Sequence, residues 1–123
     1  TARDRVDYEG TVVMLKADPT LLLTGIVSAL EHSLECSSGR VRVDILLREK
    51  LAVLAIEADR PSGPNLSREE LPSLFDVDQA WRAGHSVELA VTARVASLHG
   101  GCARFPKRTA RARLELSFPR VDE

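Results

Sequence analysis

The residues able to do acid–base, nucleophilic or metal chemistry are few in this chain. The histidines and cysteines are His32, His85, His99, Cys36 and Cys102. Their spacing matches no zinc-protease helix, paired-cysteine zinc site or nucleophile elbow. Glu31 and Glu35 flank His32 in a stretch with helical periodicity, where neighbouring polar residues usually form the solvent-facing side. We therefore predict no metal site, no catalytic residue among these types, and two reduced, partly buried cysteines.

Composition narrows the class of protein. The chain has 123 residues, the size of one domain, and its 17 basic and 18 acidic residues give a net charge of −1. A dedicated nucleic-acid binder usually carries a basic excess, so we expect no nucleic-acid partner. No stretch reaches the roughly 18 apolar residues of a membrane span, and the charged N-terminus has no signal-peptide core. We expect a cytoplasmic domain without membrane contact, excised from a longer chain because it has no initiator methionine.

The elements that must position any site begin with a predicted strand over Val12–Lys16. Asp18-Pro19 predicts a helix start, with Asp as the N-cap and Pro at the first helical position, and Gly39 is the predicted left-handed C-cap. The apolar residues at helical spacing in between are Leu22, Ile26, Ala29, Leu30 and Leu34. Alternation over Arg40–Leu47 predicts a strand, and the uniformly apolar run Leu51–Ala58 predicts a central strand paired with it.

The second half begins after a loop rich in Pro, Gly and Ser over residues 60–67. We predict a short helix over Leu71–Phe75, an irregular segment over residues 76–83 and a long helix over Gly84–Leu98, followed by strands near Cys102–Phe105 and Arg111–Phe118. This order predicts an α/β two-layer sandwich, with a mixed, mostly antiparallel sheet and three helices on one face. The outward arginines that indicate a wet second face are Arg40, Arg42, Arg111 and Arg113.

Six short strings follow this order of elements. They read ADPTLL from Ala17, LEHSL from Leu30, VLAIEAD from Val53, LPSLF from Leu71, LAVTARVASLHGG from Leu89 and LELSFP from Leu114. In order and spacing the chain resembles the GHKL (Bergerat-fold) ATPases, specifically the catalytic and ATP-binding domain of sensor histidine kinases. The resemblance runs from about residue 12 to residue 119 and implies one such domain over residues 1–123.

The resemblance implies a nucleotide site whose candidate residues are Asp59, Gly63, Gly84, Ser28 and His32. Asp59 is at the position of the family's adenine-binding aspartate, or else it caps a turn. Gly63 is the remaining glycine of the loop that follows, where Pro61 replaces the first glycine. Ser28 and His32 are at the helix positions of a polar residue and of the magnesium-binding asparagine. Imidazole suits zinc or copper better than magnesium, so His32 is alternatively a solvent-facing or loosely packed helix residue.

The phosphate-binding parts of the family's site also differ here. Gly84 is the one glycine kept from the family's glycine box, and Glu88 places a carboxylate where another glycine belongs. A carboxylate repels a triphosphate, although at a helix start it also complements the helix dipole. Lys107 and Arg108 form a basic turn where the family has a late glycine-rich turn. We therefore expect no bound cofactor, with ATP and Mg²⁺ as the alternative.

These departures favour a degenerate histidine-kinase ATPase-like domain in two-component signalling, acting as a pseudokinase, a protein-interaction module or a module associated with phosphotransfer. The expected partners are dimerisation or phosphoacceptor helices, a response regulator or a kinase. The interaction candidates are Trp81, Val77, Phe75 and Leu71. Alternatively, Trp81 folds back and plugs the vacated nucleotide pocket. Two enzyme hypotheses stay open: an active sensor-kinase domain that phosphorylates a partner histidine, and an anti-sigma-type serine kinase.

Overall fold

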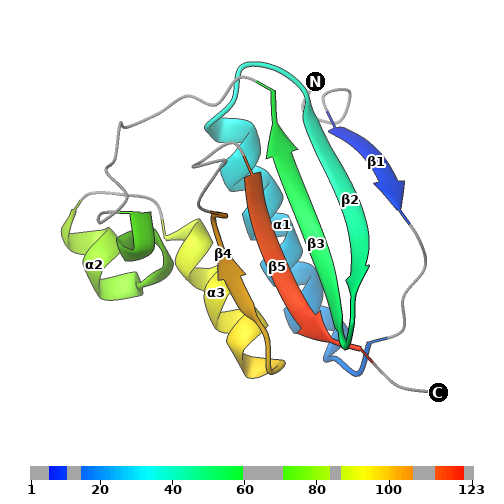
Figure 1. Cartoon of the computed structure of the whole chain (residues 1–123). Coiled ribbons are helices and arrows are strands. Elements are labelled where there is room, and N and C mark those ends of the chain that lie inside the picture. Colours follow the sequence, from blue (N-terminus) through cyan, green and yellow to red (C-terminus); the bar gives the residue numbers. More distant parts are fainter. Residues whose placement is uncertain (1–5, 11–14, 60–70, 84–86, 107–112, 121–123) are drawn as a thin grey trace.

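The fold is a two-layer α/β sandwich. The computed structural model describes residues 6–10, 15–59, 71–83, 87–106 and 113–120. Figure 1 shows a five-stranded sheet in the order β1-β2-β3-β5-β4, with the helices against one face. Among the strand pairs of the described residues, β1–β2 alone is parallel, so the predicted mixed, mostly antiparallel sheet with helices on one face is confirmed. The elements are β1 Val6–Gly10, α1 Pro19–Glu35, β2 Val41–Arg48, β3 Leu51–Ala58, η2 Leu71–Phe75, α2 Val77–Arg82, α3 Glu88–Leu98, β4 Cys102–Arg104 and β5 Arg113–Pro119.

The first strand lies earlier in the chain than predicted. The strand predicted over Val12–Lys16 is wrong at its described end, because Leu15 and Lys16 lie in the non-strand run before α1; residues 11–14 lie outside the described chain. β1 pairs in parallel with β2, and α1 makes the crossover that a parallel pair needs. β1 is an edge strand, which has one neighbouring strand and one face covered by the core. A single apolar residue that packs against the core, Val6, is enough to place such a strand. Apolar periodicity alone favoured the later segment.

The start of α1 is as predicted, but its end is not. The Asp18 carboxylate accepts hydrogen bonds from the backbone N–H groups of Thr20 and Leu21 at 3.0 and 3.1 Å, which is N-capping. The helix ends at Cys36 rather than at Gly39, and the Gly39 N–H instead donates to the Ser37 hydroxyl at 3.2 Å. This side-chain turn closes the connection to β2 without the left-handed glycine that the sequence suggested.

The strands predicted around the hairpin are confirmed. β2 and β3 pair antiparallel from Val41↔Ala58 to Arg48↔Leu51, and β3 lies between β2 and β5. β3 is buried on both faces from Ala52 to Ile56, as predicted for a central strand. β4 and β5 also form where strands were predicted, with β4 at the free edge of the sheet.

The segment predicted to be irregular, residues 76–83, contains α2. Asp76 caps this helix by accepting a hydrogen bond from the Gln79 N–H at 2.9 Å. Asp78 in the first turn and Arg82 in the last turn both complement the helix dipole. The N-cap and the two charged residues stabilise a short helix in a segment whose apolar residues show little helical periodicity. α3 is shorter than predicted, since Val87 precedes its first helical residue with non-helical φ and ψ angles.

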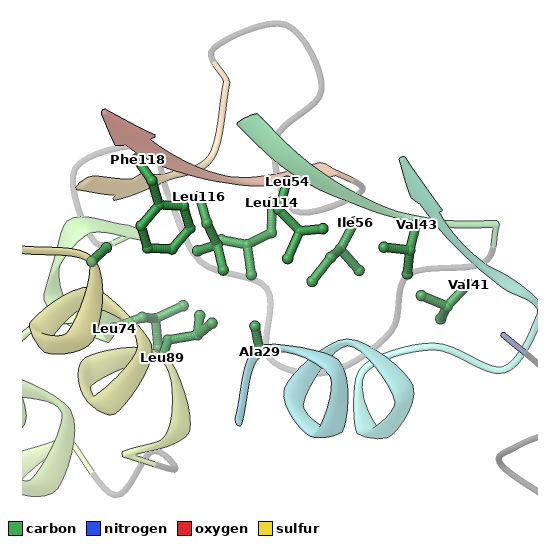
Figure 2. Close-up of a cluster of buried hydrophobic side chains, with 11 residues drawn as sticks. Ala29, Val41, Val43, Leu54, Ile56, Leu74, Leu89, Leu114, Leu116 and Phe118 are labelled. Atoms are coloured by element: carbon green, nitrogen blue, oxygen red, sulfur yellow. The ribbon is translucent and has the colours of Figure 1, made fainter. Parts of the chain in front are cut away.

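The main core lies between the sheet and the helices (Figure 2). Its buried members include Leu54 and Ile56 from β3, Leu114 and Leu116 from β5, and Leu89 from α3. The helix residues Leu22, Ile26 and Leu30 are half-buried and pack against this cluster, as predicted. Val53, also on β3, is buried on the opposite face of the strand, because side chains alternate along a strand.

α1 and α3 are in direct contact with each other through small residues. A Cβ on Gly25 would come within 2.8 Å of the Cβ of Val95, so the helices approach too closely there for any side chain. The Thr92 hydroxyl donates to the Gly25 carbonyl oxygen at 2.9 Å, and both groups are buried. Ala29 and Ala96 are fully buried beside this contact. Glycine is therefore needed in the middle of α1 despite its low helix propensity.

His99 joins the end of α3 to the start of α1. Its Nδ1 lies 2.8 Å from the Val95 carbonyl oxygen, and its Nε2 accepts the Asp18 backbone N–H at 3.1 Å. Both bonds are satisfied by a neutral ring with its proton on Nδ1, a tautomer assigned here from geometry. Gly100, with φ of +79°, and Gly101, whose N–H donates to Ala96 at 2.8 Å, then end the helix. His99 and the two glycines therefore form the C-terminal cap of α3.

The opposite face of the sheet holds an ion cluster where a wet face was predicted. Glu115 is only 4% exposed and lies on β5 between three arginines. Arg48 donates to both of its oxygens at 3.2 and 3.1 Å, Arg104 to Oε1 at 3.1 Å and Arg113 to Oε2 at 3.0 Å. Arg113, one of the residues expected in solvent, is 19% exposed and also donates to Glu57.

The Glu115 carboxylate is held ionised by its partners. Burial acts to raise the pKa of Glu115, but hydrogen bonds from Arg48, Arg113 and Arg104 outweigh it, so the pKa lies below its ordinary value. Burial likewise acts to lower the pKa of Arg113, and its bonds to Glu115 and Glu57 raise it instead. Arg48 is on β2 and Glu115 is on β5, so this ion pair spans the central strand.

We predict that Gly25→Ala destabilises the protein by about 1–3 kcal/mol, the usual cost of overpacking. The added methyl group would overlap Val95, whose Cβ cannot turn away. Chemical denaturation measures the free energy of unfolding. The matched background is Val95→Gly, which removes both the Cβ and the Cγ atoms that the new methyl group would meet, so the same Gly25→Ala change should there be neutral or stabilising, because alanine is the better helix former. An equal cost in both backgrounds would show that the contact with Val95 does not require the glycine.

We also predict that stability falls at acid pH through Glu115. Its pKa is lower in the folded than in the unfolded protein, where a glutamate titrates near pH ~4.3. The contribution is therefore complete above that pH and is lost as the pH falls through the folded-state pKa. Glu115→Gln should cost about 1–3 kcal/mol at neutral pH and flatten the acid limb of the unfolding free energy.

The matched control is Glu57→Gln. Glu57 is 46% exposed and pairs with Arg113 alone among its described contacts. An exposed pair of this kind contributes less than about 1 kcal/mol. If both variants keep the acid limb of the unchanged protein, Glu115 is not its source.

Candidate functional site

Three elements meet at one end of the sandwich. Asp59 follows β3, its N–H donates to the Arg40 carbonyl oxygen at 3.0 Å, and its side chain is exposed. α3 runs antiparallel to α1, since His99 lies against Asp18 while Thr92 lies against Gly25. The second half of α1, the start of α3 and the end of β3 are thus found at the same end (Figure 1). This is the end at which the sequence resemblance locates a nucleotide.

The α1 residues of the candidate site point inward. Ser28 and His32 lie one helical turn apart; Ser28 is half-buried and His32 is 8% exposed. The prediction that Glu31 and Glu35 are solvent-facing is confirmed, but the same prediction for His32 is wrong. The reason is helical geometry: His32 follows Gly25 by seven residues and Ala29 by three, so it shares the face that packs inward.

The chemistry of these side chains does not fit magnesium and a triphosphate. Mg²⁺ prefers oxygen ligands in octahedral geometry, whereas the buried group in the last turn of α1, where the resemblance implies an asparagine, is the His32 imidazole. Glu88 is the first residue of α3 and half-buried, so it brings a negative charge to the helix end that would otherwise attract phosphate. Asp59 remains a group that could accept a hydrogen bond from an adenine amino group.

Other candidate residues of the site lie outside the described chain. They are Pro61, Gly63, Gly84, His85, Lys107 and Arg108. Within the described residues no group of three or more His, Cys, Asp or Glu side chains is close enough to hold a metal ion. Both cysteines are free thiols; Cys36 is half-buried, whereas Cys102 is exposed rather than partly buried as predicted. No helix in the described ranges combines the length and apolarity needed to cross a bilayer.

Of the interaction candidates, the two on α2 are exposed. Trp81 is 76% exposed and Val77 is 56% exposed. The alternative in which Trp81 folds back to plug a pocket is therefore wrong for this structure. Phe75 is half-buried, and its ring centroid is 5.3 Å from that of Phe105, so its side chain packs partly against the hydrophobic core. Leu71 is the first residue of η2.

A groove runs between α2 and the outer side of α3. Its volume is about 640 Å³, and its lining residues are Phe75, Asp76, Val77, Asp78, Ala90, Ala93, Arg94 and Ser97. The α3 members were missed by sequence reasoning. Their signal was the spacing of Ala90, Ala93 and Ser97, which puts small residues on one outer stripe of the helix. Small side chains leave room for a partner between the helices.

No family model and no curated protein sequence matches the chain significantly, but solved structures do. The mycobacterial sensor histidine kinase MprB has 19% identity and a TM-score of 0.69 over 98% of this chain and 88% of that chain. A nucleotide-free form of the catalytic domain of histidine kinase ThkA has 15% identity and a TM-score of 0.75, over 98% and 84%. The ATP-binding domain of PrrB from Mycobacterium tuberculosis has 22% identity and a TM-score of 0.72, over 98% and 86%.

The structural match extends over nearly the whole chain in each of these three comparisons. The match covers 98% of this chain in each case, so it extends over the sheet that the sequence predicted and over the edge strand β1, which the sequence located later in the chain. At these identities the likeness concerns the fold. The chain has the GHKL, or Bergerat, fold of the catalytic and ATP-binding domains of histidine kinases.

Proposed function

We propose that this chain is a histidine-kinase-like module of two-component signalling that works through protein contacts rather than by transferring phosphate from ATP. The observation that carries the proposal is the 76% exposure of Trp81 on α2, one helical turn after the groove residue Val77. A tryptophan exposed to water contributes no hydrophobic stabilisation to the fold of an isolated domain, and this chain has one tryptophan. Trp is among the residues that most often dominate binding energy at protein interfaces.

The expected partner is a helix or a helix pair. The groove combines apolar or small residues, such as Phe75, Val77 and Ala93, with the charged Asp78 and Arg94. An amphipathic helix recognises such a surface by laying its apolar face in the groove and its charged residues along the rim. The dimerisation or phosphoacceptor helices of a signalling protein have this chemistry. We further propose that the module works in the cytoplasm, where a response regulator or a kinase is also available to it.

The chemistry of the nucleotide end supports a role without ATP. His32 provides imidazole where magnesium needs oxygen, and Glu88 opposes phosphate at the start of α3. The competing hypothesis, an active kinase that phosphorylates a histidine or a serine, is favoured by one observation. Asp59 is exposed at the end of β3 with its carboxylate available to an adenine.

We predict that ATP with Mg²⁺ binds with a Kd weaker than about 1 mM, an affinity of roughly 4 kcal/mol. The physical reason is the loss of oxygen ligands and the added negative charge at the phosphate end. Isothermal titration calorimetry of the chain with ATP and Mg²⁺ measures this directly.

The control for that titration is Asp59→Asn, which removes the carboxylate that would accept from adenine and leaves the end of β3 intact. A Kd in the low micromolar range that is lost in Asp59→Asn would contradict the proposal. It would restore the two kinase hypotheses, which radiolabelled phosphotransfer to histidine or serine substrates would then separate.

We predict that Trp81→Ala weakens binding to a histidine-kinase dimerisation domain from the same organism at least tenfold, on the order of 1.4 kcal/mol. Biolayer interferometry with the purified domain measures the Kd. Thermal unfolding should change little, because the Trp81 side chain is mostly in solvent. The matched control is Leu23→Ala on α1, an apolar residue 63% exposed away from the groove. Equal losses in both variants would rule out the groove as the contact.

A further inference from the structure

The face of the sheet opposite the helices carries a second cavity, of about 260 Å³. Its lining combines apolar residues, Leu51 and Val53, with three charged ones, Arg48, Arg104 and Glu115. Two arginines therefore face a single carboxylate, which leaves the cavity with a surplus positive charge. Leu51 is 38% exposed, so the cavity also has accessible apolar surface.

The Glu115 carboxylate has little capacity left to accept further hydrogen bonds. Its Oε1 receives hydrogen bonds from Arg48 and Arg104, and its Oε2 receives bonds from Arg48 and Arg113. A carboxylate has about four lone-pair sites, so these four bonds use its capacity. The arginines are in excess of what a buried glutamate needs, because one bidentate arginine already neutralises it.

The two outer arginines keep unused donors. A guanidinium has about five N–H donors. Among the described contacts, Arg48 uses two of them and Arg104 uses one. Their side chains are 46% and 60% exposed, so the remaining donors are accessible from solvent. Glu115 also fixes both guanidinium groups beside one oxygen atom, which lowers the conformational entropy that a new ligand would have to remove.

Other charged side chains lie on the same face. The neighbouring register row places Glu57 between Arg42 and Arg113, and Arg113 donates to both Glu57 and Glu115. Asp44 lies in the same row as Glu115, two strands away. Arg48 and Arg104 differ from Arg42 in that they line the cavity, beside the exposed apolar surface of Leu51.

We propose that this face, centred on Arg48 and Arg104, docks an acidic segment of a protein partner. Carboxylates of the segment bind the outward donors of the two arginines, and an adjacent aliphatic side chain covers Leu51. Charge complementarity selects the partner, since the chain as a whole has a net charge of only −1 and does not attract polyanions in general. This surface lies on the opposite side of the sheet from the α2–α3 groove, so it is independent of the function proposed above.

The test is a titration of the isotope-labelled chain with a short synthetic peptide of alternating Glu and Leu, followed by two-dimensional amide NMR at low salt. The backbone amides of Leu51, Cys102 and Arg104 should shift in a saturable way, and those of α2 and α3 should not. Arg104→Gln should raise the Kd roughly tenfold, the effect expected for one charge-assisted hydrogen bond. Its side chain is 60% exposed, so the variant is expected to fold.

Matched controls separate this surface from general electrostatics. Arg82→Gln removes an exposed positive charge from the end of α2 and should leave the Kd unchanged. A peptide of alternating Lys and Leu should not bind. The proposal is overturned if no shifts occur at millimolar peptide, if Arg82→Gln weakens binding as much as Arg104→Gln, or if both peptides bind equally. Shifts that depend on protein concentration without peptide would overturn it in favour of an interface between two copies. Arg48→Gln provides a second variant with the same expectation as Arg104→Gln.

Discussion

The close approach of α1 and α3 at Gly25 is the constraint on which the arrangement of the helical layer depends. A glycine there lets Val95 and Thr92 reach the backbone of α1, and the buried Thr92–Gly25 hydrogen bond fixes the depth and register of the contact. Once the register is fixed, the two ends of the helix pair are fixed as well. Asp18 meets His99 at one end, and the second half of α1 meets the start of α3 at the other. The inward position of His32 is a consequence of the same packing.

The two faces of the sheet are stabilised by different kinds of interaction. The helical face buries an aliphatic cluster, and it leaves a groove and an exposed tryptophan at its periphery. On the opposite face, none of the helices in the described part of the chain covers the strands (Figure 1). There the strands are covered by arginine side chains that converge on Glu115, with Arg48 reaching across β3. Long side chains of this kind bury apolar stems while their charged ends stay near water, which explains a nearly buried Val53 on an open face.

The function proposed above requires that the fold be kept while the nucleotide chemistry differs from that of an ATP-binding domain. The packing of α1 against α3 and the capping by Asp18 and His99 do not depend on a nucleotide. The side chains at the nucleotide end are free to change as long as this packing persists. The groove along α2 and the arginine pair on the sheet are then the features with unused binding capacity.

The sequence by itself determined most of the elements and their order. The Asp18 cap, the alternation along β2, the continuous apolar run of β3 and the glycines after α3 are local signals, and each acts within a few residues. The six short sequence strings, taken in order, then indicated the fold, because they contain these same capping residues, turn residues and apolar repeats. The short helix α2 was predictable in principle from the Asp76 cap.

The tertiary structure decided what depends on residues far apart in the chain. An edge strand is defined by its sheet neighbour, so β1 was not visible in its own weak periodicity. The four-residue cluster around Glu115 joins β2, β4 and β5, and no local pattern links Arg48 to a residue on another strand. Whether His32 faces solvent and whether Trp81 folds back were likewise set by helix packing. A helical sequence gives the spacing of its side chains, but only its neighbours determine which side is covered.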